Sequence, residues 1–229
     1  MLSFGFPVMS QTCPATALLF DLDGVIIDSM PLHTQAWELY LKRLGKWVPD
    51  LEKRMHGARN DQIVSAFLGE SLTPAEIFEH GAAKERLFRE MMQPLLERHI
   101  VPGLREFLAA FEPLPKAIAS NAEPANIDFV LDGAGLRGFF AETVDGHQVA
   151  HAKPFPDVYL RAAELLGTPP ERCIVFEDSP TGVEAGRRAG MRVAGVGTHQ
   201  GSLEGVEIMA PDFRDPRLAA WLTRELERC

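Results

Sequence analysis

The stretch ALLFDLDGVIIDS, from Ala17 to Ser29, decides how the fold of this chain is interpreted. An apolar run typical of a buried strand leads directly into Asp21 and Asp23, and Gly24 then permits a sharp turn. In an extended segment, residues two apart face the same way, so both carboxylates could meet one ligand. Buried carboxylates are unfavourable unless they are paired, neutralised or bound to a metal. Some chemistry or some binding partner must therefore explain the pair.

The composition disfavours several classes of binding partner. The chain has 229 residues and a net charge of −9, which disfavours binding to nucleic acid or to anionic membranes. No apolar run is long enough to span a membrane. The three cysteines show no disulfide or zinc-site spacing and indicate reduced thiols in a cytoplasmic protein. We expect a small-molecule partner, and the sequence is compatible with a monomer but does not fix the oligomeric state.

Short apolar segments alternate with helical patterns along most of the chain, which predicts an α/β fold with a parallel sheet covered on both faces. The strand candidates are Ala17–Asp21, Lys116–Ser120, Glu142–Asp145, Cys173–Glu177 and Arg192–Val196. Several of them end in a polar or acidic residue. Because open α/β sheets bind ligands beyond the carboxyl ends of their strands, we expect the functional site at that edge.

The interval between the first two strand candidates is too long for a simple crossover. Its predicted helices are His33–Leu44, Asp61–Leu68 and Pro74–Glu97, with interruptions at Gly69 and Gly81. We therefore interpret residues 30–98 as a small inserted α-helical cap domain. Residues 17–29 and 99–229 would form a Rossmann-like, doubly wound core, and residues 1–16 a flexible N-terminal tail.

Three further polar motifs follow other strand candidates. In AIASNA, Ser120 and Asn121 could donate to phosphate oxygens, although for this motif taken alone an N-cap of the helix that begins near Glu123 is the simpler interpretation. In AKPFPD, Lys153 stands before two prolines that stiffen its segment. In FEDSPTG, Glu177 and Asp178 end an apolar strand and could either cap the next helix or bind a hard cation.

Together, DLDGVIIDS, ASN, AKPFPD and FEDSPTG resemble the motifs of the haloacid dehalogenase (HAD) superfamily in order and spacing. The resemblance extends from Ala17 to Val196. The insert after the first strand is similar to the branch that contains β-phosphoglucomutase and sugar-phosphate phosphatases. The resemblance implies a Mg²⁺-dependent phosphatase that hydrolyses a small phosphorylated metabolite, with a sugar phosphate as the preferred candidate. A β-phosphoglucomutase-type mutase is the alternative.

The resemblance also assigns catalytic roles. Asp21 would be the nucleophile that forms an aspartyl-phosphate, and Asp23 the general acid/base. Since an isolated aspartate has a pKa of about 3.9, the pKa of Asp23 is expected to be raised. Ser120 and Lys153 would bind the phosphoryl oxygens and stabilise their charge.

Four acidic residues beside a phosphate dianion would repel one another and the substrate. Two like charges about 4 Å apart cost roughly 4 kcal/mol at an effective dielectric constant near 20. Mg²⁺ relieves this repulsion and prefers oxygen ligands. The resemblance implies that its ligands are the side chains of Asp21 and Asp178, the backbone carbonyl of Asp23 and, as a further candidate, Glu177.

The predicted cap contributes candidates for substrate binding. His33 stands near the start of the first cap helix, where members of the β-phosphoglucomutase branch carry a histidine. The loop RMHGARNDQI could present Arg59 to the substrate, with its turn at Gly57. The chain departs from the mutase pattern at Ala122 and Pro124, which offer little grip on a second phosphate. Trp37 and Tyr40 are interpreted as the core of the cap.

The residues disfavour two other functions of this fold. A 2-haloacid dehalogenase uses the same fold and an aspartate nucleophile, but it needs neither a metal nor an acid/base two positions on. The presence of Asp23 and of the Glu177–Asp178 pair disfavours that activity. A binding or regulatory relic of the fold would have a broken catalytic set, whereas all four motifs are intact here.

Overall fold

A computed structural model of the chain describes residues 16–55, 59–69, 71–197 and 203–228. Within this part, one parallel six-stranded sheet has the strand order β3-β2-β1-β4-β5-β6. The strands are β1 (Ala17–Phe20), β2 (Lys116–Ala119), β3 (Glu142–Val144), β4 (Cys173–Glu177), β5 (Arg192–Val196) and β6 (Ile208–Ala210). The α/β fold with a parallel sheet is confirmed. The predicted strands do not include β6.

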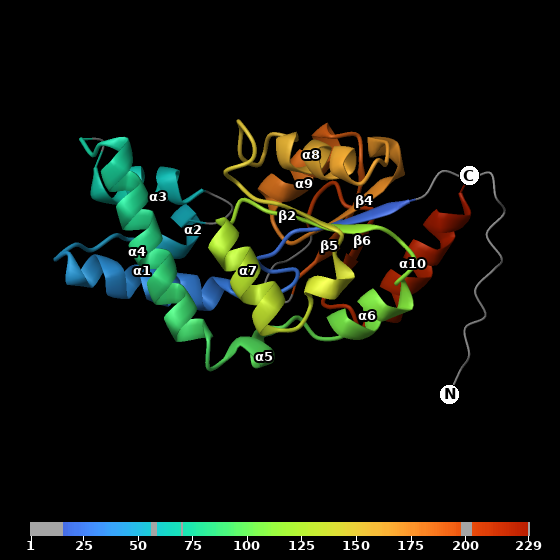
Figure 1. Ribbon diagram of the computed structural model, residues 1–229, viewed down its shortest axis with the longest axis horizontal. Helices are drawn as coiled ribbons and strands as arrows, with labels where there is room; N and C mark the ends of the chain where they lie inside the picture. The colour runs from blue at the N-terminus through green and yellow to red at the C-terminus, as the bar shows by residue number, and fades with distance from the viewer. Residues whose placement is uncertain (1–15, 56–58, 70, 198–202, 229) are drawn as a thin grey trace.

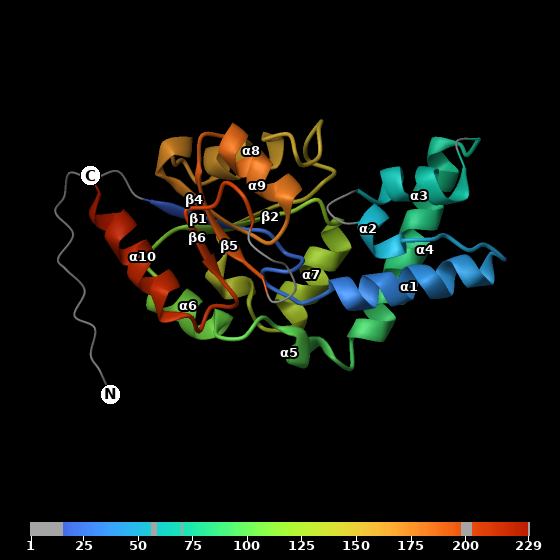
Figure 2. The ribbon, with the colours of Figure 1, turned by 180° about the vertical axis from the view of Figure 1, so that it is seen from behind.

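Helices cover both faces of the sheet. On one face lie α8 (Asp157–Leu165) and α9 (Pro180–Arg188), and on the other α6 (Leu104–Ala110) and α10 (Pro216–Glu227), as both ribbon views show (Figures 1 and 2). The remaining core helices are α5 (Leu96–His99), α7 (Pro124–Gly133) and the short 3₁₀ turns η1 (Arg137–Phe139) and η2 (Pro170–Arg172). This arrangement confirms the doubly wound architecture.

The side chains of β1 alternate between the two faces of the sheet, so this strand contributes to two hydrophobic clusters. Leu18 and Phe20 point into the cluster under α6 and α10, whereas Ala17 and Leu19 point into the cluster under α8 and α9. Because the strand is buried on both faces, its sequence is a continuous run of apolar residues. Phe20 stacks on Phe176 of β4 with ring centroids 4.5 Å apart.

The interval after β1 forms α1 (Met30–Arg43), α2 (Leu51–Met55), α3 (Asn60–Leu68) and α4 (Pro74–Met92). These helices have their own apolar cluster, which includes the buried Trp37. The predicted interruption at Gly81 is wrong, because α4 passes through this residue as a continuous helix. A mid-helix glycine costs about 1 kcal/mol, and the packing of α4 on α1 and α3 outweighs this.

Close packing of α9 on the sheet depends on glycine. A Cβ atom at Gly186 would lie 2.9 Å from Val193 Cγ2 of β5. Gly190 follows the helix with φ +76°, a backbone conformation that favours glycine. The predicted tail and Cys13, Gly57 and Cys229 lie outside the described residues. In the described part, no helix is both long and apolar enough to cross a membrane.

The aromatic cluster beneath the sheet gives a test of the core. Phe107 on α6 is 4% exposed and packs edge-on against Phe176. We expect Phe107→Ala to lower the free energy of unfolding by about 3–5 kcal/mol, because the deletion leaves a cavity. Urea unfolding followed by circular dichroism would measure this loss.

Phe78→Ala provides the matched control, since Phe78 on α4 is 65% exposed. Its effect should stay within about 0.5 kcal/mol. Equal losses for the two variants would contradict the assignment of Phe107 to the core.

Candidate active site

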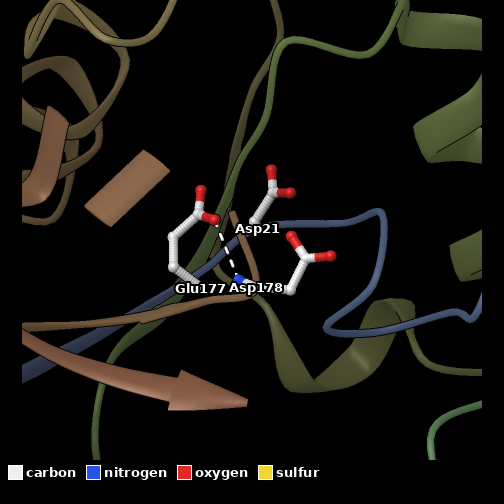
Figure 3. A group of neighbouring side chains, drawn as sticks. All are labelled: Asp21, Glu177 and Asp178. Atoms are coloured by element: carbon white, nitrogen blue, oxygen red, sulfur yellow. Dashed lines mark hydrogen bonds between the residues drawn. The ribbon is translucent and has the colours of Figure 1, made fainter. Parts of the chain in front are cut away.

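The polar motifs converge at the carboxyl edge of the sheet. Asp21 follows β1, Ser120 follows β2, and Glu177 and Asp178 stand at the end of β4. Figure 3 shows the three carboxylates of Asp21, Glu177 and Asp178 gathered where their strands end. Because β1 lies between β2 and β4, parallel strands bring these residues together although they are distant in sequence.

Lys153 lies at the centre of this acidic group. Its Nζ donates to Asp21 Oδ1 and to Glu177 Oε1, both at 2.7 Å, and the residue is 7% exposed. Burial alone would lower the pKa of Lys153, but the two carboxylates outweigh it and raise the pKa. The backbone N–H of Lys153 donates to Asn121 Oδ1 at 3.2 Å. Asn121, predicted to bind substrate, therefore also positions the lysine.

Glu177 is completely buried and accepts hydrogen bonds from five donors. Oε1 accepts from Lys153 Nζ and Tyr159 Oη, and Oε2 accepts from the backbone N–H of Asp178 and from both the N–H and hydroxyl of Ser179. A carboxylate offers about four lone-pair positions, so these donors saturate it. Burial raises the pKa of Glu177, but Lys153 and the hydrogen bonds bring it below its ordinary value. Direct metal ligation by Glu177 stays a prediction.

Asp21 and Asp178 are carboxyl groups whose negative charge, when they are ionised, the protein compensates only in part. Burial, opposed in part by Lys153, raises the pKa of Asp21 to about 7. Burial, with the charges of Glu177 and Asp21, raises the pKa of Asp178 well above its ordinary value.

One oxygen from each of Asp21, Glu177 and Asp178 lies within 4.8 Å of the others. This oxygen-only set fits a hard divalent cation such as Mg²⁺, whose charge would lower the raised pKa values.

Two glycines make room for the acidic side chains. A Cβ atom at Gly24 would lie 2.0 Å from Asp178 Oδ2, and one at Gly182 would lie 1.8 Å from Glu177 Oε1. Gly24 also has φ +77°, which side chains rarely allow. The carboxylates of Asp178 and Glu177 therefore occupy space that any other residue at these two positions would fill.

Asp23 lies beside a different set of groups. Its Oδ1 accepts from the Ser29 hydroxyl at 2.5 Å and lies 3.4 Å from His33 Nε2. Burial raises the pKa of Asp23, but the contacts with His33 and Ser29 outweigh it and hold the pKa below its ordinary value. The expected upward shift at Asp23 is therefore wrong for this arrangement, because the sequence does not show that donors surround this carboxylate.

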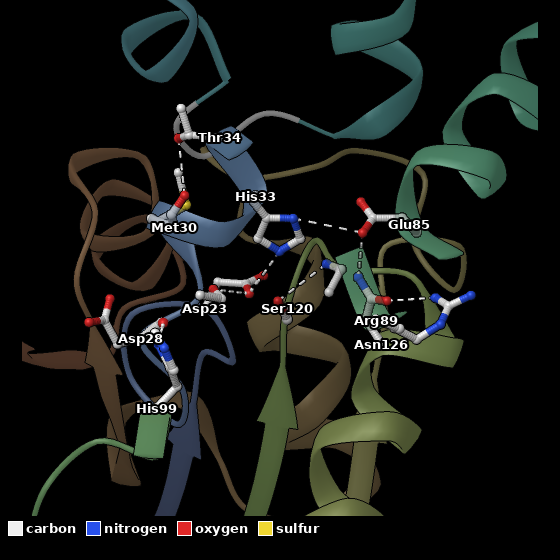
Figure 4. A network of polar contacts seen from close by, with 12 residues as sticks. Asp23, Asp28, Met30, His33, Thr34, Glu85, Arg89, His99, Ser120 and Asn126 are labelled. Carbon is white, nitrogen blue, oxygen red and sulfur yellow. Dashed lines mark hydrogen bonds and ion pairs between the residues drawn. The ribbon is translucent and has the colours of Figure 1, made fainter. Parts of the chain in front are cut away.

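A buried polar network extends from His33 toward the core helix α7. His33 Nδ1 lies 3.1 Å from Lys84 Nζ, and Lys84 forms an ion pair with Glu85. Glu85 accepts from Asn126 Nδ2 at 2.8 Å. Figure 4 shows His33 between Asp23 and Glu85, with Asn126 and Arg89 beyond. The sequence predicts His33 as a site residue but not Lys84, Glu85 or Asn126. A lysine–glutamate pair on a helix ordinarily indicates a solvated face.

Two adjoining cavities lie in front of these groups. The first, of about 100 Å³, is lined by residues that include Asp21, Asp23, His33, Ser120, Lys153 and Asp178. The second, of about 470 Å³, is lined by residues that include Arg59, Asn121 and Glu123. Asn60 and Asn121 line both cavities. The structure thus brings the predicted core residues and His33 together, whereas Arg59 stands at the second cavity, 3.4 Å from Asp61.

Known proteins resemble this chain along most of its length. The sequence model of the haloacid dehalogenase-like hydrolase family matches residues 15–190. Fructose-1-phosphate phosphatase YqaB of Escherichia coli (strain K12) is 32% identical over 178 residues, which are 76% of this chain and 92% of that protein. A protein named β-phosphoglucomutase from Mycobacterium bovis is 34% identical over 218 residues, covering 82% of this chain and 81% of that protein.

A solved structure shows the same fold. The crystal structure of β-phosphoglucomutase from Clostridium difficile superposes with a TM-score of 0.82. The alignment covers 93% of this chain and 97% of that chain at 22% sequence identity. At this identity the likeness establishes the architecture alone.

The raised pKa values predict how metal-free protein responds to pH. Because the folded state holds protons on Asp21 and Asp178 more tightly than the unfolded chain does, stability should fall as pH rises from about 4 to about 7. Differential scanning fluorimetry in EDTA should show a falling melting temperature, by roughly 2–4 °C per kcal/mol lost. Added Mg²⁺ should raise the melting temperature more at pH 8 than at pH 5.

Asp178→Asn is the control for this prediction, because the amide removes one titrating carboxylate. This variant should show a weaker dependence on pH and a smaller response to Mg²⁺. A melting temperature that rises from pH 5 to pH 7.5 in EDTA would refute the assignment of only partly compensated charge to these residues.

Proposed function

This chain belongs to the haloacid dehalogenase-like hydrolase family, and on that premise we propose that it is a Mg²⁺-dependent phosphatase. It hydrolyses a small phosphorylated metabolite, with a sugar phosphate as the preferred candidate, through an aspartyl-phosphate. The observation that carries the proposal is the buried contact of Lys153 with Asp21, because it places a cation and a nucleophile where one phosphoryl group can meet both.

In the first step, a carboxylate oxygen of Asp21 attacks phosphorus, and the bond from phosphorus to the leaving-group oxygen breaks. Lys153 Nζ and the Ser120 hydroxyl bind phosphoryl oxygens and stabilise the charge that develops on them. Mg²⁺, held by Asp21, Asp178 and the Asp23 carbonyl with Glu177 as a further candidate, would neutralise phosphoryl charge when bound. The product of this step is the aspartyl-phosphate of Asp21.

Asp23 moves the protons in both steps. It protonates the leaving oxygen and then takes a proton from the water that attacks the aspartyl-phosphate. Its pKa is lowered when the site holds no substrate, and an incoming phosphate dianion raises it. His33, which contacts Asp23 on the cap side, holds the carboxylate in position and meets the substrate.

The substrate class follows from the relatives. The Escherichia coli relative is named for a fructose phosphate and the Mycobacterium bovis relative for a phosphoglucose reaction. A phosphatase requires only the phosphoryl site and water, whereas a mutase must also hold a second phosphate. The loop after β2 carries Ala122 and Pro124, whose side chains donate no hydrogen bond. A mutase remains the second candidate because of the Mycobacterium bovis relative.

The setting of the reaction is also proposed. Residues 30–98 would act as the cap that excludes water, with residues 17–29 and 99–229 as the core. His33 and Lys84 reach the first cavity from this cap. The acidic net charge disfavours nucleic acid as a partner, and the cysteine pattern, with a buried free thiol at Cys173, is typical of a cytoplasmic protein.

Asp21→Asn should abolish turnover, because the amide cannot serve as the nucleophile. We expect a loss on the order of 10³-fold or more in phosphate release from a panel of sugar phosphates with Mg²⁺. The exposed Asp128, paired with Arg137 on the surface, supplies the control Asp128→Asn, which should retain activity. Wild-type turnover by Asp21→Asn would rule out the nucleophile.

A second assay separates the two candidate functions. The enzyme is incubated with β-glucose 1-phosphate, Mg²⁺ and a trace of glucose 1,6-bisphosphate. A phosphatase releases free phosphate, because water resolves the aspartyl-phosphate. Accumulation of glucose 6-phosphate without free phosphate would instead establish the mutase and overturn the proposal.

A further inference from the structure

Glu123 stands at the point where a phosphate would ordinarily find a binding site. It is the N-cap residue of α7, three residues after Ser120 in the loop that follows β2. Helix N-termini attract anions because their N–H groups are unpaired and the helix dipole is positive there. In this chain the first residue of the helix, Pro124, has no N–H to offer. The residue before it is itself an acid, so the favourable position already has a negative charge.

The arginine nearest to this carboxylate is also engaged. Arg89 of α4 donates through Nη1 to Glu123 Oε1 and to Asn126 Oδ1, the latter at 2.6 Å. The side chains of Arg89 and Glu123 are only 21% and 14% exposed. Asn126 in turn donates to the buried Glu85. Arg89 is therefore fixed by the protein and is not available to a second phosphate while Glu123 holds it.

Within the described part of the chain, the lysines and arginines that line the cavities a leaving group would enter are all paired with carboxylates. Asn60 and Asn121 line both cavities, so the second adjoins the first, and the leaving group of a phosphate ester bound at Asp21 has room to extend toward it. Among the described residues that line the two cavities, each lysine and arginine contacts a carboxylate. The pairs are Lys153 with Asp21 and Glu177, Lys84 with Glu85, and Arg59 with Asp61. Glu123 adds a further carboxylate to the second cavity.

We propose that Glu123 is a specificity-determining residue, which restricts the substrate to phosphomonoesters that carry one phosphate on an otherwise uncharged leaving group. A second phosphate would approach the Glu123 carboxylate in a cavity whose lysine and arginine charges are already paired, and the two anions repel each other. An uncharged hydroxylated leaving group meets no such repulsion. This inference rests on the proposed phosphatase function.

The test compares two esters of the same sugar, fructose 1-phosphate and fructose 1,6-bisphosphate. Initial rates of phosphate release with Mg²⁺ give kcat/KM for each ester, and their ratio is independent of the fraction of active enzyme. We expect the wild-type protein to prefer the monophosphate by about tenfold or more. Equal values, or a preference for the bisphosphate, would overturn the inference and leave the phosphatase function intact.

Two variants should move this ratio in opposite directions. Glu123→Gln removes the negative charge and releases Arg89, so the preference for the monophosphate should shrink to within about threefold. Arg89→Met removes the charge that neutralises Glu123, so the preference should increase. Glu97→Gln is the matched control, because Glu97 pairs with Arg105 outside both cavities, and its ratio should equal that of the wild type. An unchanged ratio in Glu123→Gln would refute the role of this residue.

A binding measurement separates failure of the inference from failure of the proposed function. If no phosphomonoester is hydrolysed, the phosphatase proposal fails. Calorimetric titration of Asp21→Asn with each ester in Mg²⁺ then still tests the selectivity. Tighter binding of fructose 1-phosphate supports the inference, whereas equal binding of both esters, tighter binding of the bisphosphate or binding of neither overturns it.

Discussion

The site depends on one buried ammonium group. Lys153 Nζ lies between the carboxylates of Asp21 and Glu177, which end two neighbouring strands. Without this charge, acidic residues at the same sheet edge would repel one another in a region that water barely reaches. Glu177 is saturated by its donors and so fixes the lysine. Lys153 could therefore exchange its contact with Asp21 for one with a phosphoryl oxygen while its contact with Glu177 persists. The same contact holds the acidic edge together and positions Asp21, the proposed nucleophile.

Helices α1 and α4 are joined to the rest of the structure by polar contacts as well as by apolar packing. The network from Asp23 through His33, Lys84 and Glu85 to Asn126 passes through these two helices and ends on α7. Buried polar groups of this kind are stable only when each of them is satisfied. Their geometry thus ties the position of Asp23, the proposed acid/base, to the positions of α1 and α4, and a displacement of these helices would leave several charges unpaired.

The sequence predicted the sheet and the convergence of polar residues at one of its edges because both depend on local pattern. Apolar runs that end in Asp21, Ser120 or Glu177 indicate strands, and parallel strands necessarily bring their carboxyl ends together. It did not predict the electrostatics of Asp23, since the donors on that carboxylate depend on tertiary contacts. Glu85 was missed for the same reason: its burial depends on helices α1, α4 and α7 meeting. The predicted interruption at Gly81 failed because packing between helices outweighed local propensity.

The carboxylates of Asp178 and Glu177 can take their positions only because Gly24 and Gly182 have no Cβ atom. Each glycine leaves a notch in the backbone surface, and an acidic side chain from β4 or the residue after it is seated in that notch. A designer who grafts this centre onto another scaffold would have to transfer the two notches along with the carboxylates. The two glycines also offer a way to recognise a related site in another protein. The space that they leave can persist where the acidic residue that fills it has been replaced.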